Sequence, residues 1–409
     1  MKLKEVKANI VLDSRGNETI EVIVNTNCWT RAPAGKSTGK YEKKAYKKDA
    51  RGDSEVINKI NVNELPELKV FEDLVLIEEK FAKKVGANTL FALEASILKA
   101  LAKSNGMELW KFLNPNASIF PRFISNTIGG GAHTNSKVKP DFQEFLVTCN
   151  KNPSICELIN KKCHERAEKI LHTLKDEQPK KNDENAWMTD LDNERVIEVM
   201  KNIQENVFEE SNMHVDIGLD VAASQFYDKK TKKYEYKDRI CSRTREEQIE
   251  YICDIANRYN LFYLEDPLDE GDFEGFAEIV KKVKCLVVGD DLTTTNLKRT
   301  EKAIKSGAIT GIIIKPNQIG SLLEVKKVID LCNKNVIKTI MSHRSGETED
   351  NTIADLAFAW ACDFIKIPVV GKERLAKVKR LQEIEFSLKK TSGSEDLKLR
   401  RQNIDVEGV

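Results

Sequence analysis

Three short apolar runs in the middle of the chain each end in a charged residue, and these charges recur at equal intervals. Asp290 comes 25 residues after Glu265, and Lys315 comes 25 residues after Asp290. An interval of about 25 residues holds one strand, one helix and two short loops. Repeated units of this kind favour a β/α barrel, in which the strand ends open on one face and build a site. The pattern therefore predicts one site assembled from several strands.

The same form, an apolar run with a charge at its end, occurs at four other places, residues 143–145, 217–220, 340–344 and 364–366. Any one such charge is more often an ordinary strand end that faces water. Seven of them, each at an expected strand end, are better explained by a shared site.

Composition narrows the class of protein. With 66 Lys and Arg against 65 Asp and Glu, the net charge of +1 gives no long-range attraction for a polyanion, which disfavours nucleic-acid binding. The nine cysteines include no C-x-x-C pair, which suits a reducing compartment and argues against a disulfide framework or a zinc site. No segment approaches the ~18 apolar residues of a membrane span. We expect a cytoplasmic protein without a membrane partner.

The 409 residues are enough for a barrel preceded by a smaller domain. Residues 5–26 alternate apolar and polar side chains around a turn at residues 13–17, which predicts a hairpin. Residues 72–104 predict a helix, with Asn88 as a plausible N-cap and Gly106 in a C-cap position.

The segment 114–121 contains two prolines and several turn residues, and we place a domain boundary there. The predicted domains are an α+β domain at residues 1–118 and a barrel at residues 119–409. Within the barrel, residues 143–147 predict a strand and residues 154–174 a helix. The tail from residue 389 has no clear periodicity, and we expect poorly specified surface structure.

Asp220, Glu265 and Asp290 would place three carboxylates on one rim of this barrel. Their mutual repulsion would raise their pKa values, so a bound divalent cation is the natural partner. Oxygen ligands without Cys or His favour magnesium over zinc.

Lys315 and Lys366 would face this metal from later strands. A lysine has a pKa near ~10.4 and acts as a base at neutral pH only if that pKa falls by about three units. A magnesium ion and a neighbouring ammonium group both lower it. A lysine base opposite a metal-held carboxylate predicts proton abstraction α to a carboxylate.

Ten segments resemble the enolase family, most closely its archaeal branch, and they occur in the family's order. They are residues 13–17, 35–39, 86–88, 143–145, 220–224, 265–267, 289–293, 315–320, 342–350 and 373–377. The resemblance implies an enolase-type, TIM-like β/α barrel after a smaller α+β domain. It also implies the reversible, magnesium-dependent dehydration of 2-phosphoglycerate to phosphoenolpyruvate in glycolysis and gluconeogenesis. A lysine base that works with magnesium is an established pairing in the enolase superfamily.

The resemblance also implies a role for each site residue. Lys315 would remove the C2 proton, and Glu184, supported by Glu144, would protonate the departing 3-hydroxyl group. Asp220, Glu265 and Asp290 would hold a first Mg²⁺ ion, and Ser37 would help to hold a second. Lys366 would bind the substrate carboxylate. The phosphate would be held or neighboured by His133, Arg344 and Ser345, and Gln143 and His343 would also bind substrate. The family further implies a homo-oligomer, either a dimer or an octamer.

The segment around Glu184 departs from the family pattern. Where the family usually has glycines on both sides of the acidic pair, this chain has Asn182, Asn185 and Ala186. The loop is therefore expected to be stiffer or aimed differently.

Two alternatives stay open. One is another enolase-superfamily reaction, an acid dehydration or an epimerisation, which the phosphate-handling set Ser37, His343, Arg344 and Ser345 disfavours. The other is an enolase-derived binding protein that has lost catalysis. The complete set of metal and base residues speaks against it, and the altered Glu184 loop keeps it open.

Overall fold

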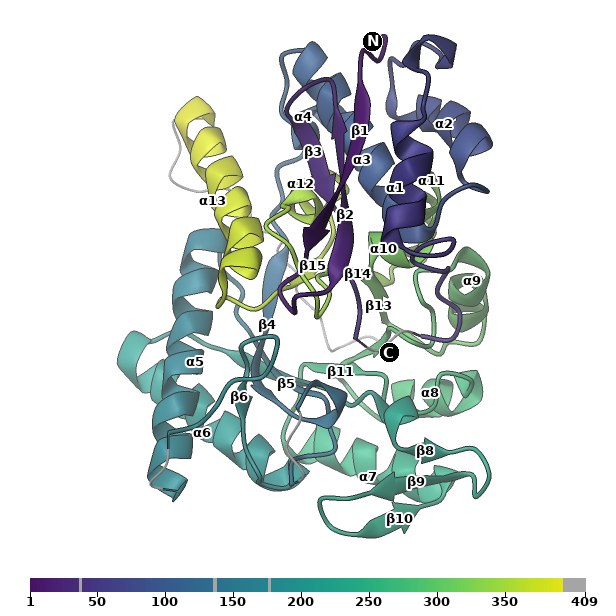
Figure 1. Cartoon of the computed structure of the whole chain (residues 1–409). Helices are drawn as coiled ribbons and strands as arrows, with labels where there is room; N and C mark the ends of the chain where they lie inside the picture. The colour runs from purple at the N-terminus through teal and green to yellow at the C-terminus, as the bar shows by residue number, and fades with distance from the viewer. Residues whose placement is uncertain (37–38, 135–137, 176–177, 393–409) are drawn as a thin grey trace.

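The computed structural model describes residues 1–36, 39–134, 138–175 and 178–392. A small antiparallel sheet with its helices packs on one end of a closed eight-stranded barrel (Figure 1). This arrangement confirms the predicted fold class. Within the described ranges, every helix is too short or too polar to span a membrane.

The first unit is built on the predicted hairpin. Strands β1 (Val6–Leu12) and β2 (Glu18–Val24) pair in antiparallel fashion, and β3 (Cys28–Arg31) pairs with β2. The Asp13 carboxylate accepts hydrogen bonds from the backbone N–H groups of Arg15 and Asn17, which fixes the turn. The helical segments that follow are α1 (Ala50–Asn58), α2 (Val75–Phe81), α3 (Ala87–Ser104) and α4 (Leu109–Leu113), with 3₁₀ turns at Val62–Glu64 and Phe71–Leu74.

The helical structure predicted for residues 72–104 is present, divided between the separate helices α2 and α3. The chain at residues 44–46 crosses the start of α3 and caps it: Lys44 and Ala45 accept hydrogen bonds from the first backbone N–H groups of the helix. The N-cap is Gly86 and not Asn88. Position 86 is a glycine because a Cβ atom there would lie 2.3 Å from the Tyr46 backbone. At the other end, Gly106 has φ +66 just after the C-cap, as predicted.

The barrel strands follow in sequence order around the ring, and β15 closes it by pairing with β4. They are β4 (Arg122–Gly129), β5 (Glu144–Thr148), β7 (Asp216–Asp220), β11 (Tyr263–Glu265), β12 (Leu286–Gly289), β13 (Gly311–Ile314), β14 (Lys338–Ser342) and β15 (Phe364–Lys366). The two-residue strand β6 (Trp187–Met188) pairs beside β4, outside the ring.

Strand β5 departs from the expectation that every charge stands at the carboxyl end of its strand. It runs antiparallel to both neighbours, β4 and β7, and Glu144 is its first residue. Because the strand is reversed, its first residue lies at the same end of the barrel as the last residues of the others: Glu144 pairs with Asp220. The expected convergence therefore holds, although the expected strand direction does not.

The predicted helix at residues 154–174 is present as α5 (Pro153–Lys175). The tail prediction is wrong up to residue 392, because α13 continues that far, and residues 393–409 lie outside the described part of the chain. The other barrel helices are α6 (Asn193–Ser211), α7 (Arg245–Arg258), α8 (Phe273–Val280), α9 (Leu297–Lys305), α10 (Pro316–Ile319), α11 (Leu322–Lys334), α12 (Thr352–Ala359) and α13 (Lys372–Ser392), with 3₁₀ turns at Gly131–His133 and Ala223–Gln225. A second small sheet consists of β8 (Tyr227–Asp228), β9 (Lys233–Tyr236) and β10 (Cys241–Arg243).

The first unit covers the end of the barrel that carries the strand-end charges. Ala34 forms an isolated β-bridge with Gly346, which follows β14. The amide of Asn317 donates hydrogen bonds to the Pro33 carbonyl at 3.0 Å and to the Asn88 side chain at 2.9 Å. These contacts hold residues 33–36 over the barrel mouth. The division into domains at residues 1–118 and 119–409 stays a prediction.

Lys377 of α13 binds the loop that follows β14, at Glu347 and Thr348. Its Nζ contacts Glu347 Oε2 at 2.5 Å and the carbonyls of Thr348 and Glu373, and both charged side chains are buried. Removing one partner of a buried ion pair costs about 3–5 kcal/mol, because the other charge is left unpaired. We therefore expect Lys377→Met to lower the free energy of unfolding by about that amount, measured by urea denaturation.

The control for Lys377 is Lys372→Met in the same helix. Lys372 pairs with Glu349 at 3.0 Å, but both side chains are largely in water. Such pairs contribute little, so the midpoint of denaturation should hardly move. Equal losses in the two variants would contradict a special role for burial at Lys377.

Candidate active site

The alternation of side chains along the strands explains why the charges converge. Buried residues of the barrel interior stand two positions before several of the charges, and residues two apart on a strand face the same side. The pairs are Tyr263 with Glu265, Val288 with Asp290, Ile313 with Lys315, and Phe364 with Lys366. The charged side chains therefore continue the interior rows and project into the barrel mouth.

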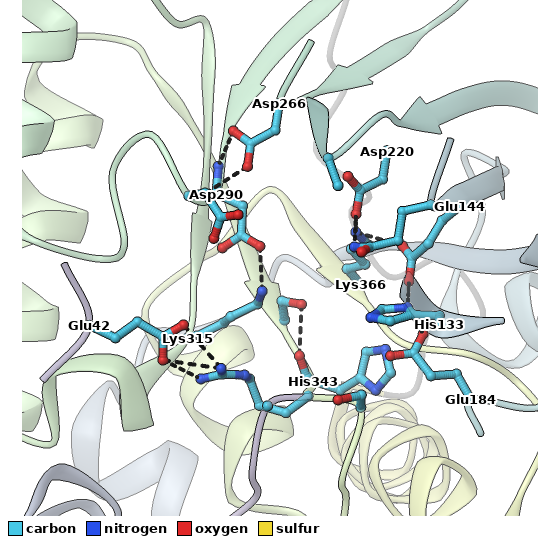
Figure 2. Close-up of a pocket in the computed structure, with 17 residues that line it drawn as sticks. Glu42, His133, Glu144, Glu184, Asp220, Asp266, Asp290, Lys315, His343 and Lys366 are labelled. Atoms are coloured by element: carbon cyan, nitrogen blue, oxygen red, sulfur yellow. Dashed lines mark hydrogen bonds and ion pairs between the residues drawn. The ribbon is translucent and has the colours of Figure 1, made fainter. Parts of the chain in front are cut away.

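A pocket opens at this mouth, and Figure 2 shows its lining. It includes every predicted site residue except Glu265 and Ser37. Glu265 is completely buried just behind the lining. Ser37 lies outside the described residues. The predicted residues in the lining are His133, Gln143, Glu144, Glu184, Asp220, Asp290, Lys315, His343, Arg344, Ser345 and Lys366.

Lys366 stands among three carboxylates. Its Nζ lies 2.7 Å from Glu144 Oε2, 2.8 Å from Glu265 Oε2 and 3.0 Å from Asp220 Oδ2. Burial opposes the charge, but the carboxylates of Asp220, Glu144 and Glu265 outweigh it and raise the pKa of Lys366 well above its usual value. Lys366 is therefore a permanent ammonium group, suited to binding an anion and unsuited to acting as a base.

Lys315 makes a separate ion pair on the other side of the pocket. Its Nζ lies 2.5 Å from Asp290 Oδ2. Burial favours the neutral amine, but Asp290 overrides burial and raises the pKa of Lys315. The protein alone therefore holds Lys315 as an ammonium ion, and partial neutralisation of Asp290 would favour the free amine.

Two acidic residues beside the predicted ligands were missed by sequence reasoning. The Asp266 carboxylate accepts hydrogen bonds from the backbone N–H groups of Asp290 at 3.0 Å and Asp291 at 2.7 Å. Burial, followed by the charge of Asp290, raises the pKa of Asp291 to about 7. Asp266 and Asp291 each directly follow a predicted ligand, so Glu265 and Asp290 each have a second acid beside them in the sequence. These pairs of adjacent acids are the pattern from which both residues could have been predicted.

His133, Glu144 and Glu184 form a buried cluster opposite Lys315 (Figure 2). His133 Nδ1 lies 3.4 Å from Glu184 Oε2 and 3.6 Å from Glu144 Oε1. Burial would keep the imidazole neutral, but Glu184 and Glu144 overcome it and raise the pKa of His133 to about 10. The same pairing, against the opposing effect of burial, lowers the pKa of Glu184. Both shifts favour a protonated His133 that faces an ionised Glu184.

The loop around Glu184 aims its side chain into the pocket without the usual glycines. The Asn182 side-chain oxygen accepts hydrogen bonds from the backbone N–H groups of Glu184 and Ala186, both at 3.0 Å. Asn185 has φ +66, a left-handed conformation that asparagine tolerates better than most residues. Two asparagines thus provide the turn, and the Glu184 side chain lines the pocket. The expectation that the altered loop is stiffer or aimed differently stays a prediction.

His164 of α5 is hydrogen-bonded to the same loop, its Nε2 donating to the Asn185 carbonyl at 2.8 Å. Burial lowers the pKa of His164 to about 4, against the ordinary value of 6.5. A histidine with a lowered pKa in the folded state contributes stability at pH values above its ordinary pKa of 6.5, and this contribution is lost as the pH falls to about 4. We therefore expect wild type to lose on the order of 3 kcal/mol more stability than His164→Gln between pH 7 and 4, by urea denaturation at each pH. Parallel curves would contradict this assignment.

The segment after β14 supplies the remaining predicted binding residues. Burial, followed by the charge of Arg374, lowers the pKa of His343 well below its usual value, so the ring is neutral. Arg344 pairs with Glu42 at 3.1 Å, a partner from the first unit that sequence reasoning also missed. Ser345 Oγ accepts the backbone N–H of Lys36 at 2.7 Å.

The acidic groups of the pocket fit a divalent cation. Burial and neighbouring carboxylates raise the pKa values of Asp220, Glu265 and Asp266. The positive side chains nearby therefore do not balance the negative charge of these carboxylates. Glu265 Oε1 is buried and has no hydrogen-bond partner. Asp290 clusters with Asp266 and Asp291, whereas Asp220 and Glu265 converge on Lys366. An all-oxygen donor set of this charge is typical of magnesium sites.

Comparison with known proteins agrees with this geometry. Two family models match, "Enolase, N-terminal domain" over residues 3–113 and "Enolase, C-terminal TIM barrel domain" over residues 117–401. Proteins named enolase from Methanocorpusculum labreanum and Methanothermobacter thermautotrophicus are each 38% identical, over 94% of this chain and 99% and 96% of their own lengths. The enolase of Archaeoglobus fulgidus is 35% identical over 94% of this chain and 97% of its own length. The chain belongs to the enolase family.

Proposed function

We propose a role for each pocket residue in the reaction of this family, the dehydration of 2-phosphoglycerate to phosphoenolpyruvate. Family membership makes the chain a metal-dependent hydro-lyase of glycolysis, with a small molecule as its substrate.

One observation carries the assignment of the proton transfers: two separate proton-handling groups face the pocket from opposite sides. Lys315 ends on one side, the His133–Glu184 pair ends on the other, and Lys366 lies between them (Figure 2). Removal of a proton from C2 and delivery of another to the 3-hydroxyl group can be performed by two such groups, one on each side of the substrate. Lys315 takes the first role, and Glu184 takes the second.

Glu184 must be protonated before it can act as an acid. Its proton is stored on His133, whose Nδ1 lies 3.4 Å from Glu184 Oε2. Substrate that binds between Lys315 and this pair excludes water and brings the 3-hydroxyl group to Glu184. The proton then passes from His133 through Glu184 to the leaving oxygen. Glu144, 3.6 Å from the same His133 nitrogen, keeps the imidazolium in place.

The binding residues hold the substrate between these two groups. The Lys366 ammonium binds the substrate carboxylate, where negative charge builds up as the C2 proton leaves. Arg344, Ser345 and His133 bind or neighbour the phosphate, and Gln143 and His343 complete the polar lining.

We further propose that two Mg²⁺ ions bind, the first held by Asp220, Glu265 and Asp290 and the second with the help of Ser37. When bound, Mg²⁺ neutralises the substrate carboxylate and so makes loss of the C2 proton feasible. We place the enzyme in the cytoplasm as a homo-oligomer, a dimer or an octamer, which light scattering on the purified protein would test. Neither a nucleic acid nor a membrane is a proposed partner.

Metal removal tests this proposal. Formation of phosphoenolpyruvate, followed by its ultraviolet absorbance, should require Mg²⁺ and stop when a chelator is added. Mg²⁺ alone should raise the midpoint of thermal unfolding of wild type, because a ligand that binds only the folded state stabilises it. In Asp290→Asn this rise should be smaller, since a ligand charge is lost.

Three results would overturn the proposal in different ways. Turnover unaffected by the chelator would remove the metal from the mechanism. No thermal shift with Mg²⁺ would remove the metal site. Magnesium-dependent binding of 2-phosphoglycerate without product would indicate a family member that has lost catalysis.

A further inference from the structure

The clearest feature outside the pocket lining is the contact between helix α5 and the loop of Glu184. His164 on α5 is 6% exposed, and its Nε2 donates to the carbonyl of Asn185, the residue after Glu184. In the reverse direction, the indole N–H of Trp187 donates to the His164 carbonyl at 2.7 Å. The His164 ring also packs against the Trp187 ring, with centroids 4.9 Å apart. One residue of a 23-residue helix thus contacts the loop at both Asn185 and Trp187.

The opposite side of the loop is fixed by different elements. The Asp183 carboxylate pairs with Lys36 Nζ at 3.2 Å, and the Asp183 carbonyl accepts a hydrogen bond from Arg374 at 3.3 Å. Glu184 therefore lies between two anchors, Asp183 on one side and the contacts of His164 on the other. The His164 anchor comes from α5, which packs directly on β4 and β5, whereas Arg374 comes from α13, which packs on α5 and α12.

The loop needs this anchor because Asn185 has a left-handed backbone. A non-glycine residue in that region costs free energy, and it persists only where its surroundings fix it. The hydrogen bond from His164 to the carbonyl of Asn185 restrains this peptide group directly. Without the bond, Asn185 can relax toward a more common conformation, and that change would turn the neighbouring Glu184 away from His133.

We propose that His164 is a positioning residue for Glu184: its Nε2–H group holds the Asn185 peptide so that the Glu184 carboxylate meets His133 in the pocket. This inference rests on the proposed role of Glu184 as the acid. It predicts a specific defect, in which departure of the 3-hydroxyl group slows while removal of the C2 proton by Lys315 does not.

The test compares two variants that differ in the hydrogen-bond donor. His164→Phe keeps a ring to pack against Trp187 but cannot donate, and His164→Gln keeps an N–H donor at similar reach. Two rates are measured for each: phosphoenolpyruvate formation, and exchange of the C2 hydrogen of 2-phosphoglycerate with deuterium from the solvent. The matched control is His172→Phe on the exposed side of the same helix.

A misplaced catalytic group lowers the rate of its own step, so turnover of His164→Phe should fall by about 10-fold to 100-fold. Its C2 exchange should stay within about twofold of wild type, because Lys315 is untouched. His164→Gln should keep most of the turnover, and His172→Phe should match wild type. Should His164→Phe fail to fold, His164→Asn, whose amide is too short to reach the Asn185 carbonyl, should give the same pattern.

Three outcomes would overturn the proposal: wild-type turnover in His164→Phe, equal losses in the Phe and Gln variants, or a parallel fall of turnover and exchange. The parallel fall would indicate a purely structural role. Glu184→Gln, measured alongside, separates this failure from failure of the proposed function. If Glu184→Gln turns over normally, the acid assignment itself is wrong, whatever the His164 variants show.

Discussion

Lys315→Ala is expected to abolish measurable formation of phosphoenolpyruvate. A positioned general base contributes about 10²–10⁴-fold to a rate, and the alanine side chain has no group that accepts a proton. Among the described pocket residues, the other lysine is Lys366, which three carboxylates hold in its charged form. Exchange of the C2 hydrogen with solvent should disappear together with turnover, because both need the same proton abstraction. Mass spectrometry of recovered substrate measures the exchange.

Lys338→Ala is the matched control for Lys315. Lys338 begins β14, at the opposite end of the barrel from the pocket, and pairs with Asp363 at 3.3 Å. Its loss removes a lysine from a barrel strand without touching the chemistry, so turnover should stay close to wild type. Wild-type exchange in Lys315→Ala would assign the base to another residue.

Glu184→Gln is expected to lower turnover by about 10²–10⁴-fold while exchange of the C2 hydrogen continues. The amide has nearly the shape of the carboxylic acid but does not deliver an acidic proton to the leaving oxygen. Since Lys315 lies on the other side of the pocket, the first step proceeds and reverses, and substrate returns labelled. Comparison of labelled substrate with product in one reaction gives both rates.

Asp183→Asn serves as the neighbouring control. It removes the ion pair with Lys36, but the Asp183 carbonyl still accepts from Arg374 and Glu184 itself is intact, so its effect on turnover should be much smaller than that of Glu184→Gln. A loss of the same size in both variants would indicate that loop charge, and not proton donation, governs the rate. A joint loss of turnover and exchange in Glu184→Gln would contradict its assignment as the acid.

The sequence predicts the convergence of the site because strand period and spacing are local properties. Charges two residues after buried positions must continue the interior row, and regular spacing brings them to one end. The direction of β5 is not readable in the same way: Glu144 has the same neighbours in a strand of either direction. Its antiparallel pairing is set by how β5 meets β4 and β7, which is a tertiary property.

The missed residues have a related explanation. Glu42 stands far from any strand end in the sequence, and only the docking of the first unit brings it to Arg344. The helix break before Gly86 likewise results from a crossing segment that replaces a side-chain cap. In the Glu184 loop, the departure from the family pattern was visible, but its compensation by Asn182 and Asn185 depends on hydrogen bonds that spacing does not encode.

The bridge between Ala34 and Gly346 couples ligand binding in the pocket to the attachment of the first unit to the barrel. Gly35 and Glu42 of the first unit line the pocket together with barrel residues, so separation of the units would dismantle the site. By linkage, anything that binds the assembled pocket must strengthen the attachment of the units, by an amount set by its concentration relative to its Kd. Substrate should therefore protect the segment between the units, around residues 114–118, from proteases. The concentration of substrate in the cell would then affect the lifetime of the enzyme as well as its rate.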